Sequence, residues 1–255
     1  MTQLTIVKVG GQIVEEPESL NRLLRDFSQI AGHKILVHGG GRSATKLAER
    51  LNIENKMVGG RRITDEEMLK VVTMVYGGLV NKNIVAKLQS LSVDAIGLTG
   101  ADLNVILSEK RPVREIDYGF VGDVKEVNVS AFSNLLNQGF VPVLAPLTHD
   151  GKGNLLNTNA DTIAGETAKG LAFNFNVRLI FCFEKAGVLT DENDDNSVIP
   201  VLDKELFLQY KEEGIIRGGM IPKLENAFEA LAAGVKEVII TQASEINSGK
   251  GTIVR

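Results

Sequence analysis

The chain has no tryptophan, one cysteine and three histidines among its 255 residues. A single thiol cannot form an internal disulfide, and Cys182 lies within the apolar run LIFCF, so we interpret it as an inert core residue rather than a nucleophile. No apolar run reaches the roughly 18–20 residues that a membrane span needs. The N-terminus, MTQLTIVKVGG, also lacks the pattern of a signal peptide. We therefore expect a cytoplasmic protein.

Excess charge and aromatic residues are also scarce. The formal net charge is −4 and only 5% of residues are aromatic. The basic residues are scattered along the chain, which argues against a nucleic-acid-binding surface. With 44% hydrophobic and 24% charged residues and 26 glycines, the composition is typical of a globular α/β protein. The length allows one large domain or two small ones.

Strand-like and helix-like segments alternate along the chain. Residues 3–9 and 34–38 are β-rich, and each run ends at glycines that are followed by helical spacing of apolar residues. This order predicts a parallel sheet with crossover helices. We interpret the chain as one α/β domain, a three-layer αβα sandwich around a mainly parallel open sheet, with an N-terminal lobe at 1–175 and a C-terminal lobe at 176–255.

Further elements follow from the same patterns. Thr64-Asp65 is typical of a helix cap and predicts a long helix through about residue 90. Residues 103–127 predict a hairpin or meander with YGFVGDV at its turn. Other strands are expected at 93–98, 140–145, 177–183 and 237–241. Other helices are expected at 129–138, 160–170, 203–211 and 219–233.

Two glycine loops, KVGG at 8–11 and HGGG at 38–41, follow predicted strands. Such loops expose backbone N–H groups to one point, and glycine permits close approach, so they predict an anion site. Two ordinary βα turns are the alternative. The stretch GGGRSA also matches a dinucleotide fingerprint and leaves an NAD-dependent oxidoreductase open, but the acidic residue expected about 20 positions later is missing.

Three cations are candidates for that site. Lys8 lies at the carboxyl end of a strand, where open α/β sheets build their sites. Lys223 lies near a helix start, where the helix dipole disfavours a cation, so we favour an anion ligand over a solvated surface lysine. Arg62, in GGRRIT, suits a carboxylate or a phosphate.

The stretch LLNTNADTIAGETAK, residues 155–169, places Asn157, Asn159 and Asp161 at a strand-to-helix junction. These side chains are either helix caps or the polar end of a site, and Asp161 belongs to the site if the two lysines share it as a counter-ion. His38 is interpreted as structural. The acidic run DENDD, 191–195, lacks the pattern of a calcium loop and is interpreted as solvated.

The ordered set KVGG, VHGGG, GGRRIT, GLTGAD, GFVGDV, LLNTNADTIAGETA, AGVLTD and GGMIPKLENA resembles the amino-acid kinase family nearly end to end. The resemblance is to the branch that phosphorylates N-acylated glutamate. It implies that Lys8 and Lys223 neutralise the transferring phosphoryl group and that Asp161 orients both lysines. It also implies substrate and phosphate binding by a set of glycine amides and polar side chains: Gly10, Gly11, Gly40, Gly41, Arg62 and Asn157.

The same resemblance implies ATP as cosubstrate, with Mg²⁺ carried by the nucleotide phosphates. The nucleotide is expected along two segments of the C-terminal lobe: Glu184, Lys185, Ala186, Gly187, Val188, Leu189, and Ile215, Ile216, Arg217. The implied reaction is phosphorylation of the γ-carboxylate of N-acetyl-L-glutamate in arginine biosynthesis. N-succinyl-L-glutamate as acceptor and a non-catalytic nucleotide sensor are the alternatives.

The chain departs from the family pattern at three places. Phe183-Glu184 stands where Thr/Ser-Asp is usual, Leu103 stands where glycine is common, and Tyr76 precedes an unusual glycine pair. The last two changes affect the expected acyl pocket. Arginine-inhibited relatives carry an extra N-terminal helix that is missing here, so the resemblance implies an arginine-insensitive homodimer, with the long helix after Thr64 in its interface.

Overall fold

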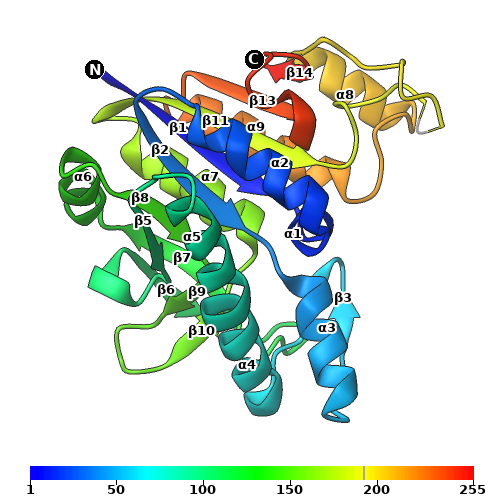
Figure 1. Ribbon diagram of the computed structural model, residues 1–255. Coiled ribbons are helices and arrows are strands. Elements are labelled where there is room, and N and C mark those ends of the chain that lie inside the picture. Colours follow the sequence, from blue (N-terminus) through cyan, green and yellow to red (C-terminus); the bar gives the residue numbers. More distant parts are fainter. Residues whose placement is uncertain (192) are drawn as a thin grey trace.

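The computed structural model describes residues 1–191 and 193–255 and places one large sheet between two layers of helices (Figure 1). Its strand order is β12-β14-β13-β11-β1-β2-β8-β5. The strands are β1 (Thr2–Val9), β2 (His33–His38), β5 (Ala95–Leu98), β8 (Val141–Leu144), β11 (Phe175–Phe183), β12 (Val201–Leu202), β13 (Glu237–Gln242) and β14 (Thr252–Val254). All neighbouring pairs in this order are parallel except β13 with β14, so the predicted mainly parallel αβα sandwich is confirmed.

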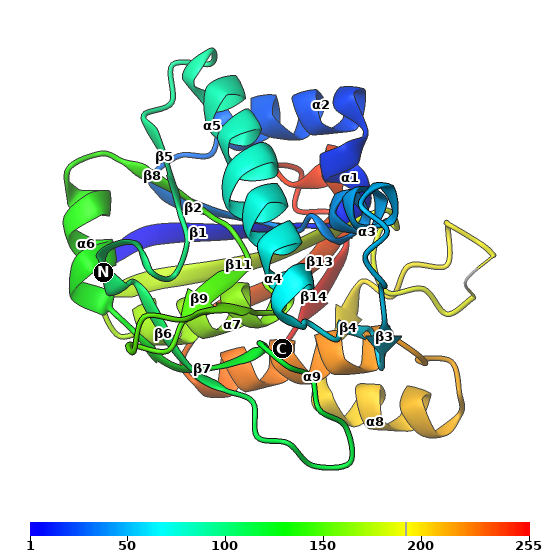
Figure 2. The same cartoon turned by 90° about the horizontal axis from the view of Figure 1, so that it is seen from below.

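Helices cover both faces of this sheet, as the view from below shows (Figure 2). On one side lie α1 (Gly11–Glu15), α2 (Pro17–Ser28), α3 (Gly41–Arg50), α4 (Glu66–Val72), a π-helix at Thr73–Val80 and α5 (Asn81–Gln89). On the other side lie α7 (Ala160–Leu171), α8 (Lys204–Glu212) and α9 (Met220–Ala232), with α6 (Val129–Asn137) beside them. No helix in the described part of the chain combines the length and apolarity of a membrane span.

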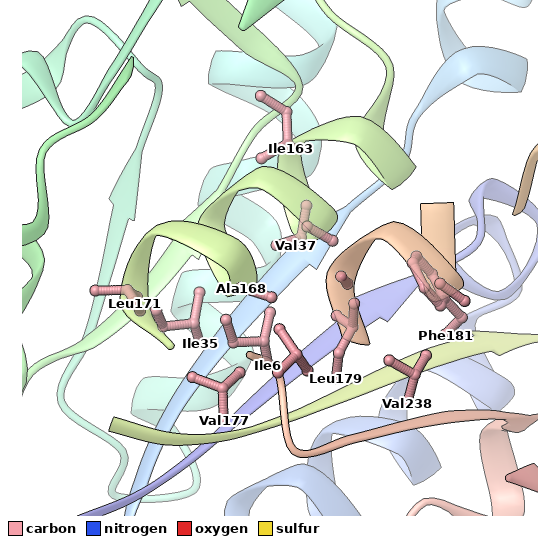
Figure 3. Packing of buried hydrophobic residues seen from close by; sticks show 14 of the residues in the cluster. Ile6, Ile35, Val37, Ile163, Ala168, Leu171, Val177, Leu179, Phe181 and Val238 are labelled. Atoms are coloured by element: carbon pink, nitrogen blue, oxygen red, sulfur yellow. The ribbon is translucent and has the colours of Figure 1, made fainter. Parts of the chain in front are cut away.

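Side-chain alternation along β1 decides which face carries the site. Leu4 and Ile6 belong to the core beneath α7 and α9, where Figure 3 shows Ile6 among the side chains of the neighbouring strands and α7. Val7 and Val9 belong to the opposite core, beneath α1 to α5. Because successive strand residues face opposite sides, Lys8 points to the α7 and α9 side, at the end of the strand.

Smaller sheets lie at the rim of the molecule. The four-stranded sheet has the order β10-β9-β6-β7, and the two-stranded sheet pairs β3 with β4. Their bounds are β3 (Met57–Val58), β4 (Arg61–Arg62), β6 (Ile106–Lys110), β7 (Gly122–Val127), β9 (Leu147–His149) and β10 (Leu155–Asn157). Short 3₁₀ turns occur at Asp102–Asn104 and Ala243–Glu245. The strand β10 ends at Asn157 and leads directly into α7.

The predicted long helix and the predicted hairpin are both confirmed, with differences in detail. The helix after Thr64 begins as expected, with Asp65 accepting a hydrogen bond from the Met68 amide at 2.8 Å, but its middle third is π-helical. The hairpin is present as β6 and β7. Its connection is residues 111–121, so YGFVGDV covers the end of that connection, at 118–121, and the start of β7, at 122–124. Gly122 serves close packing there, since a methyl group on it would lie 2.8 Å from the Thr148 hydroxyl.

Candidate active site

An ion pair joins the end of β1 to the start of α7. The Lys8 ammonium lies 2.8 Å from the Asp161 carboxylate, and both side chains are largely shielded from water, at 10% and 21% exposed. Burial alone would raise the pKa of Asp161, but the ammonium groups of Lys8 and then Lys223 hold that pKa below its ordinary value. The carboxylate is therefore ionised at neutral pH and faces two cations.

Lys223 approaches the same carboxylate from the first turns of α9. Burial lowers its pKa, the Asp161 carboxylate counters that shift, and the nearby Lys8 cation reinforces it. The ammonium lies 4.4 Å from the centre of the Phe183 ring, at the end of β11. The structure thus brings together two lysines that are far apart in the chain, with one carboxylate between them.

The capping question at the start of α7 has a clear answer. The side-chain oxygen of Asn159 accepts hydrogen bonds from the amides of Asp161 and Thr162, at 2.8 and 3.2 Å. Asn159 is the helix cap, and this leaves the carboxylate of Asp161 available to Lys8. Asn157 neither caps nor pairs with charge; its amide donates to the Thr64 hydroxyl at 2.9 Å.

The two glycine loops touch each other beside the ion pair. A methyl group on Gly39 would lie 3.1 Å from the Gly11 nitrogen, and one on Gly11 would lie 3.8 Å from the nitrogens of Gly40 and Gly41. The first loop is also held to the end of β11, because the Gly10 amide donates to the Cys182 carbonyl at 3.0 Å. Gly39 allows the two loops to approach each other closely, and the approach gathers several backbone amides at one point.

A cavity of about 330 Å³ opens next to these loops. Ala160 and Thr162, which flank Asp161, form part of its wall. The polar and aromatic side chains that line it come from separate segments of the chain and include Arg61, Arg62, Tyr76, Arg111, Asp123, Asn157 and Asn226. The cavity has the size and the mixed lining of a small-molecule site.

Arg62 is fixed in the wall of this cavity. Its guanidinium donates to the Gly41 carbonyl at 2.8 Å and to the Thr45 hydroxyl at 2.9 Å, and a further hydrogen bond reaches Asn55. The side chain is buried. An arginine held in this way offers a preorganised charge to a carboxylate that enters the cavity.

His38 supports the second glycine loop from within the core. One ring nitrogen lies 2.7 Å from the Gly39 carbonyl, and the other lies 3.1 Å from the Asn81 amide. Burial lowers the pKa of His38 to about 4, against a smaller opposing effect of the Gly39 hydrogen bond, and Lys82 lowers it further. The imidazole is therefore neutral at physiological pH and structural in its contacts, as the sequence predicted.

The two segments assigned to the nucleotide flank Lys223. Glu184 to Leu189 directly follow β11, and Ile215 to Arg217 directly precede α9. Val188, Leu189 and Ile216 are buried, whereas Glu184 and Arg217 are exposed. The segment from Glu184 turns inward at Gly187, where a methyl group would lie 2.7 Å from the Thr252 hydroxyl. Their role in nucleotide binding stays a prediction. The DENDD run contains Glu192, which lies outside the described residues.

Sequence reasoning did not place Arg111 and Asn226 in the cavity wall. It linked Tyr76 to the acyl pocket, and Tyr76 does line the cavity; its ring lies so close to Gly40 that a methyl group there would be 2.8 Å away. Asn226 lies three residues after Lys223 on α9, so helical spacing from Lys223 would have indicated the same face. Arg111 carried no local signal, because it begins the connection that follows β6 and belongs to no recognisable motif.

Comparison with known proteins gives consistent results. Acetylglutamate kinase of Parabacteroides distasonis is 70% identical over 254 residues, covering 100% of both chains, and acetylglutamate kinase of Bacteroides thetaiotaomicron is 66% identical over 99% of this chain and 98% of its own. Among solved structures, smu.665 from Streptococcus mutans UA159 matches with a TM-score of 0.81 at 29% identity, covering 98% of each chain. The profile of the amino acid kinase family matches residues 3–242. The chain belongs to the amino acid kinase family.

Proposed function

We propose that this protein is an acetylglutamate kinase, which transfers the γ-phosphoryl group of ATP to the γ-carboxylate of N-acetyl-L-glutamate in cytoplasmic arginine biosynthesis. The observation that carries the proposal is the cluster of Lys8, Asp161 and Lys223 beside two touching glycine loops and a cavity. Full-length relatives of 66–70% identity that bear this name support it.

The reaction brings the ATP phosphates and the acceptor carboxylate together, and the cations of Lys8 and Lys223 reduce the repulsion between these two anions. Phosphoryl transfer depends on positioning and on neutralising charge more than on covalent help from the protein. Lys8 and Lys223 stabilise the migrating negative charge, and the amides of Gly11 and Gly40 orient the oxygens. Gly10, which the resemblance also implied for phosphate binding, instead donates its amide to the Cys182 carbonyl. The acceptor carboxylate is already ionised at neutral pH, so the neutral His38 is not needed as a base.

The acceptor occupies the cavity, with its α-carboxylate on Arg62 and its acyl amide near Asn157. ATP binds along Glu184–Leu189 and Ile215–Arg217, with its γ-phosphate directed at the lysines. Mg²⁺ bound to the nucleotide phosphates adds charge neutralisation. We assign it no protein ligand, because Asp161 is held by two lysines and the described residues contain no group of three or more metal-ligating side chains.

Acceptor-dependent ADP release, with hydroxylamine trapping of the acyl phosphate, tests the function. We expect turnover with N-acetyl-L-glutamate, a lower kcat in Lys8→Met and Lys223→Met, and a normal kcat in the exposed control Lys125→Met. ATP binding without acceptor-dependent ADP release would instead support the sensor hypothesis. Equal activity of all three variants would contradict the assigned roles.

N-succinyl-L-glutamate is a second acceptor that the cavity favours for one reason. Arg61 and Arg111 line it in addition to Arg62, and a succinyl group carries one more carboxylate than an acetyl group. Asp123 lines the same cavity and pairs with Arg111, so this guanidinium is oriented and partly neutralised, and Arg61 carries the remaining positive charge. Kinetics with both acceptors decide the matter: if succinyl is the natural acyl group, Arg111→Met lowers kcat/KM for that acceptor and leaves the value for N-acetyl-L-glutamate unchanged.

We also propose a homodimer whose interface includes the π-helix Thr73–Val80. Met74 and Leu79 on that segment are 53% and 58% exposed, and together they give the segment an apolar surface for a partner to cover. Light scattering of Leu79→Glu tests this, with Leu208→Glu on α8, 49% exposed, as the matched control. A dimer that survives Leu79→Glu would place the interface elsewhere.

A further inference from the structure

Phe183 stands at a position where the family usually has a small hydroxyl residue. It is the last residue of β11 and is buried, at 9% exposed. The Lys223 ammonium lies 4.4 Å from the centre of its ring. This distance is well inside the range of about 6 Å for a cation–π contact.

Lys223 needs such a contact because its surroundings otherwise disfavour a cation. It lies near the N-terminus of α9, where the helix dipole is positive. The Asp161 carboxylate, which acts on Lys223, is already paired with Lys8 at 2.8 Å. The other carboxylate that acts on Lys223, Glu184, is exposed to water, which screens its charge. A buried acidic side chain in the place of the ring would attract Lys223, but it would also repel the incoming phosphoryl group. An aromatic face attracts an ammonium without adding a net negative charge.

We propose that Phe183 is a positioning residue that holds the Lys223 ammonium toward the transferring phosphoryl group through the face of its ring. The proposal rests on the proposed kinase function and assigns Phe183 no contact with substrate. The ring adds an uncharged attraction to those of Asp161 and the exposed Glu184, so it holds the ammonium without adding negative charge near the phosphoryl oxygens. Without the ring, the long lysine side chain samples other rotamers and reaches the site less often.

Progressive fluorination of the ring tests this directly. Mono-, di- and trifluorinated phenylalanine at position 183 nearly keep the ring's shape while they weaken its negative face stepwise. We expect log kcat to fall steadily with fluorine number, by about 3- to 30-fold over the series, with the KM for the acceptor unchanged. Phe181, on the same face of β11 and fully buried, is the matched control, where the same series leaves kcat constant.

The leucine variant separates the electrostatic role of the ring from simple packing. Phe183→Leu keeps an apolar side chain but has no ring face, so its kcat falls as far as that of the most fluorinated ring, while Phe183→Tyr retains turnover. A kcat that is independent of fluorine number, or a leucine variant with full turnover, overturns the proposal.

A second readout does not depend on activity. The Lys223 ε-CH₂ protons lie near the ring face and give an upfield-shifted NMR signal in lysine-labelled protein, which Lys223→Met identifies. Phe183→Leu abolishes the shift if the ring holds the ammonium, and an unchanged signal refutes the contact. Wild-type protein that keeps this shift but shows no turnover with either acceptor refutes the kinase function and, with it, the catalytic purpose of the ring, while the contact itself stands.

Discussion

Asp161→Asn removes the negative charge that lies between Lys8 and Lys223. The two ammonium groups then face each other in a shielded site, with the exposed Glu184 carboxylate acting on Lys223 from outside, while the shape of the side chain is retained. We expect this variant to lose both stability and turnover. The single lysine variants should lose turnover alone, because the remaining lysine still pairs with the carboxylate.

The geometry gives the size of the effect. Unit charges 2.8 Å apart attract by about 6 kcal/mol at an effective dielectric constant near 20. Desolvation cancels much of this, and breaking a buried pair costs about 3–5 kcal/mol. Because Asp161 is 21% exposed, water screens the remaining charges, and we expect Asp161→Asn to lower the free energy of unfolding by about 2 kcal/mol. Lys8→Met should change it by less than about 1 kcal/mol.

Urea unfolding measures the stability, and the coupled ADP assay measures kcat, which should fall by about 10²–10³ in each variant. The pH dependence adds a check. The pKa of Asp161 is lowered in the folded protein, so its stabilising contribution is fully present above the ordinary value of 3.8 and disappears as pH falls through the lowered value. The stability gap between wild type and Asp161→Asn should therefore close in acid. The shared counter-ion is refuted if Lys8→Met is destabilised as much as Asp161→Asn at pH 7.

Three further predictions concern the neighbouring contacts. Gly40→Ala should cost about 1–3 kcal/mol of unfolding free energy, because the added methyl group lies 2.8 Å from the Tyr76 ring; Tyr76→Leu should restore it, and Gly78→Ala, with nothing within 4 Å, is the control. The buried His38 has its pKa lowered to about 4 from 6.5, so wild-type stability should fall by about 3 kcal/mol more than that of His38→Gln as pH drops from 7 to 4, as urea titrations would show; parallel titrations would contradict this. Arg62→Lys keeps the charge but loses the planar fork, so the KM for the acceptor should rise about 10- to 100-fold with the KM for ATP unchanged in steady-state kinetics.

The fold was predictable where the local sequence pattern matches the burial of each residue in the folded protein. The strands β1 and β2 are continuous apolar runs that end at glycines, and α2 begins at Pro17 with four apolar residues on one face that are all buried. The strands β3, β12 and β14 are two or three residues long, too short for any periodicity. The π-helix between α4 and α5 shares the apolar pattern of an α-helix, so sequence spacing cannot reveal it.

The site was predictable in its composition but not in its bonding. Asn159 and Asp161 are both acceptable helix caps, and only the structure shows that Asn159 takes this role and leaves Asp161 to the lysines. The contact between Tyr76 and Gly40 joins two segments through tertiary packing, which no local signal encodes. Phe183 departs from the family pattern, which the sequence shows, but its contact with the Lys223 ammonium depends on how β11 and α9 pack.

The charge balance of the cluster connects its stability to its proposed chemistry. Lys8 and Lys223 share the Asp161 carboxylate, and the other carboxylate that acts on Lys223, Glu184, is exposed to water. The shielded part of the site therefore holds two positive charges and one negative charge. This imbalance is unfavourable in the free protein, and the lowered pKa of Lys223 reflects it, since burial and the Lys8 cation both oppose its charge. A phosphoryl group that enters between the lysines supplies the missing negative charge. The site is therefore more complementary to the migrating phosphoryl group than to water, and catalysis by differential binding requires this. The ring face of Phe183 attracts the Lys223 cation without neutralising its charge.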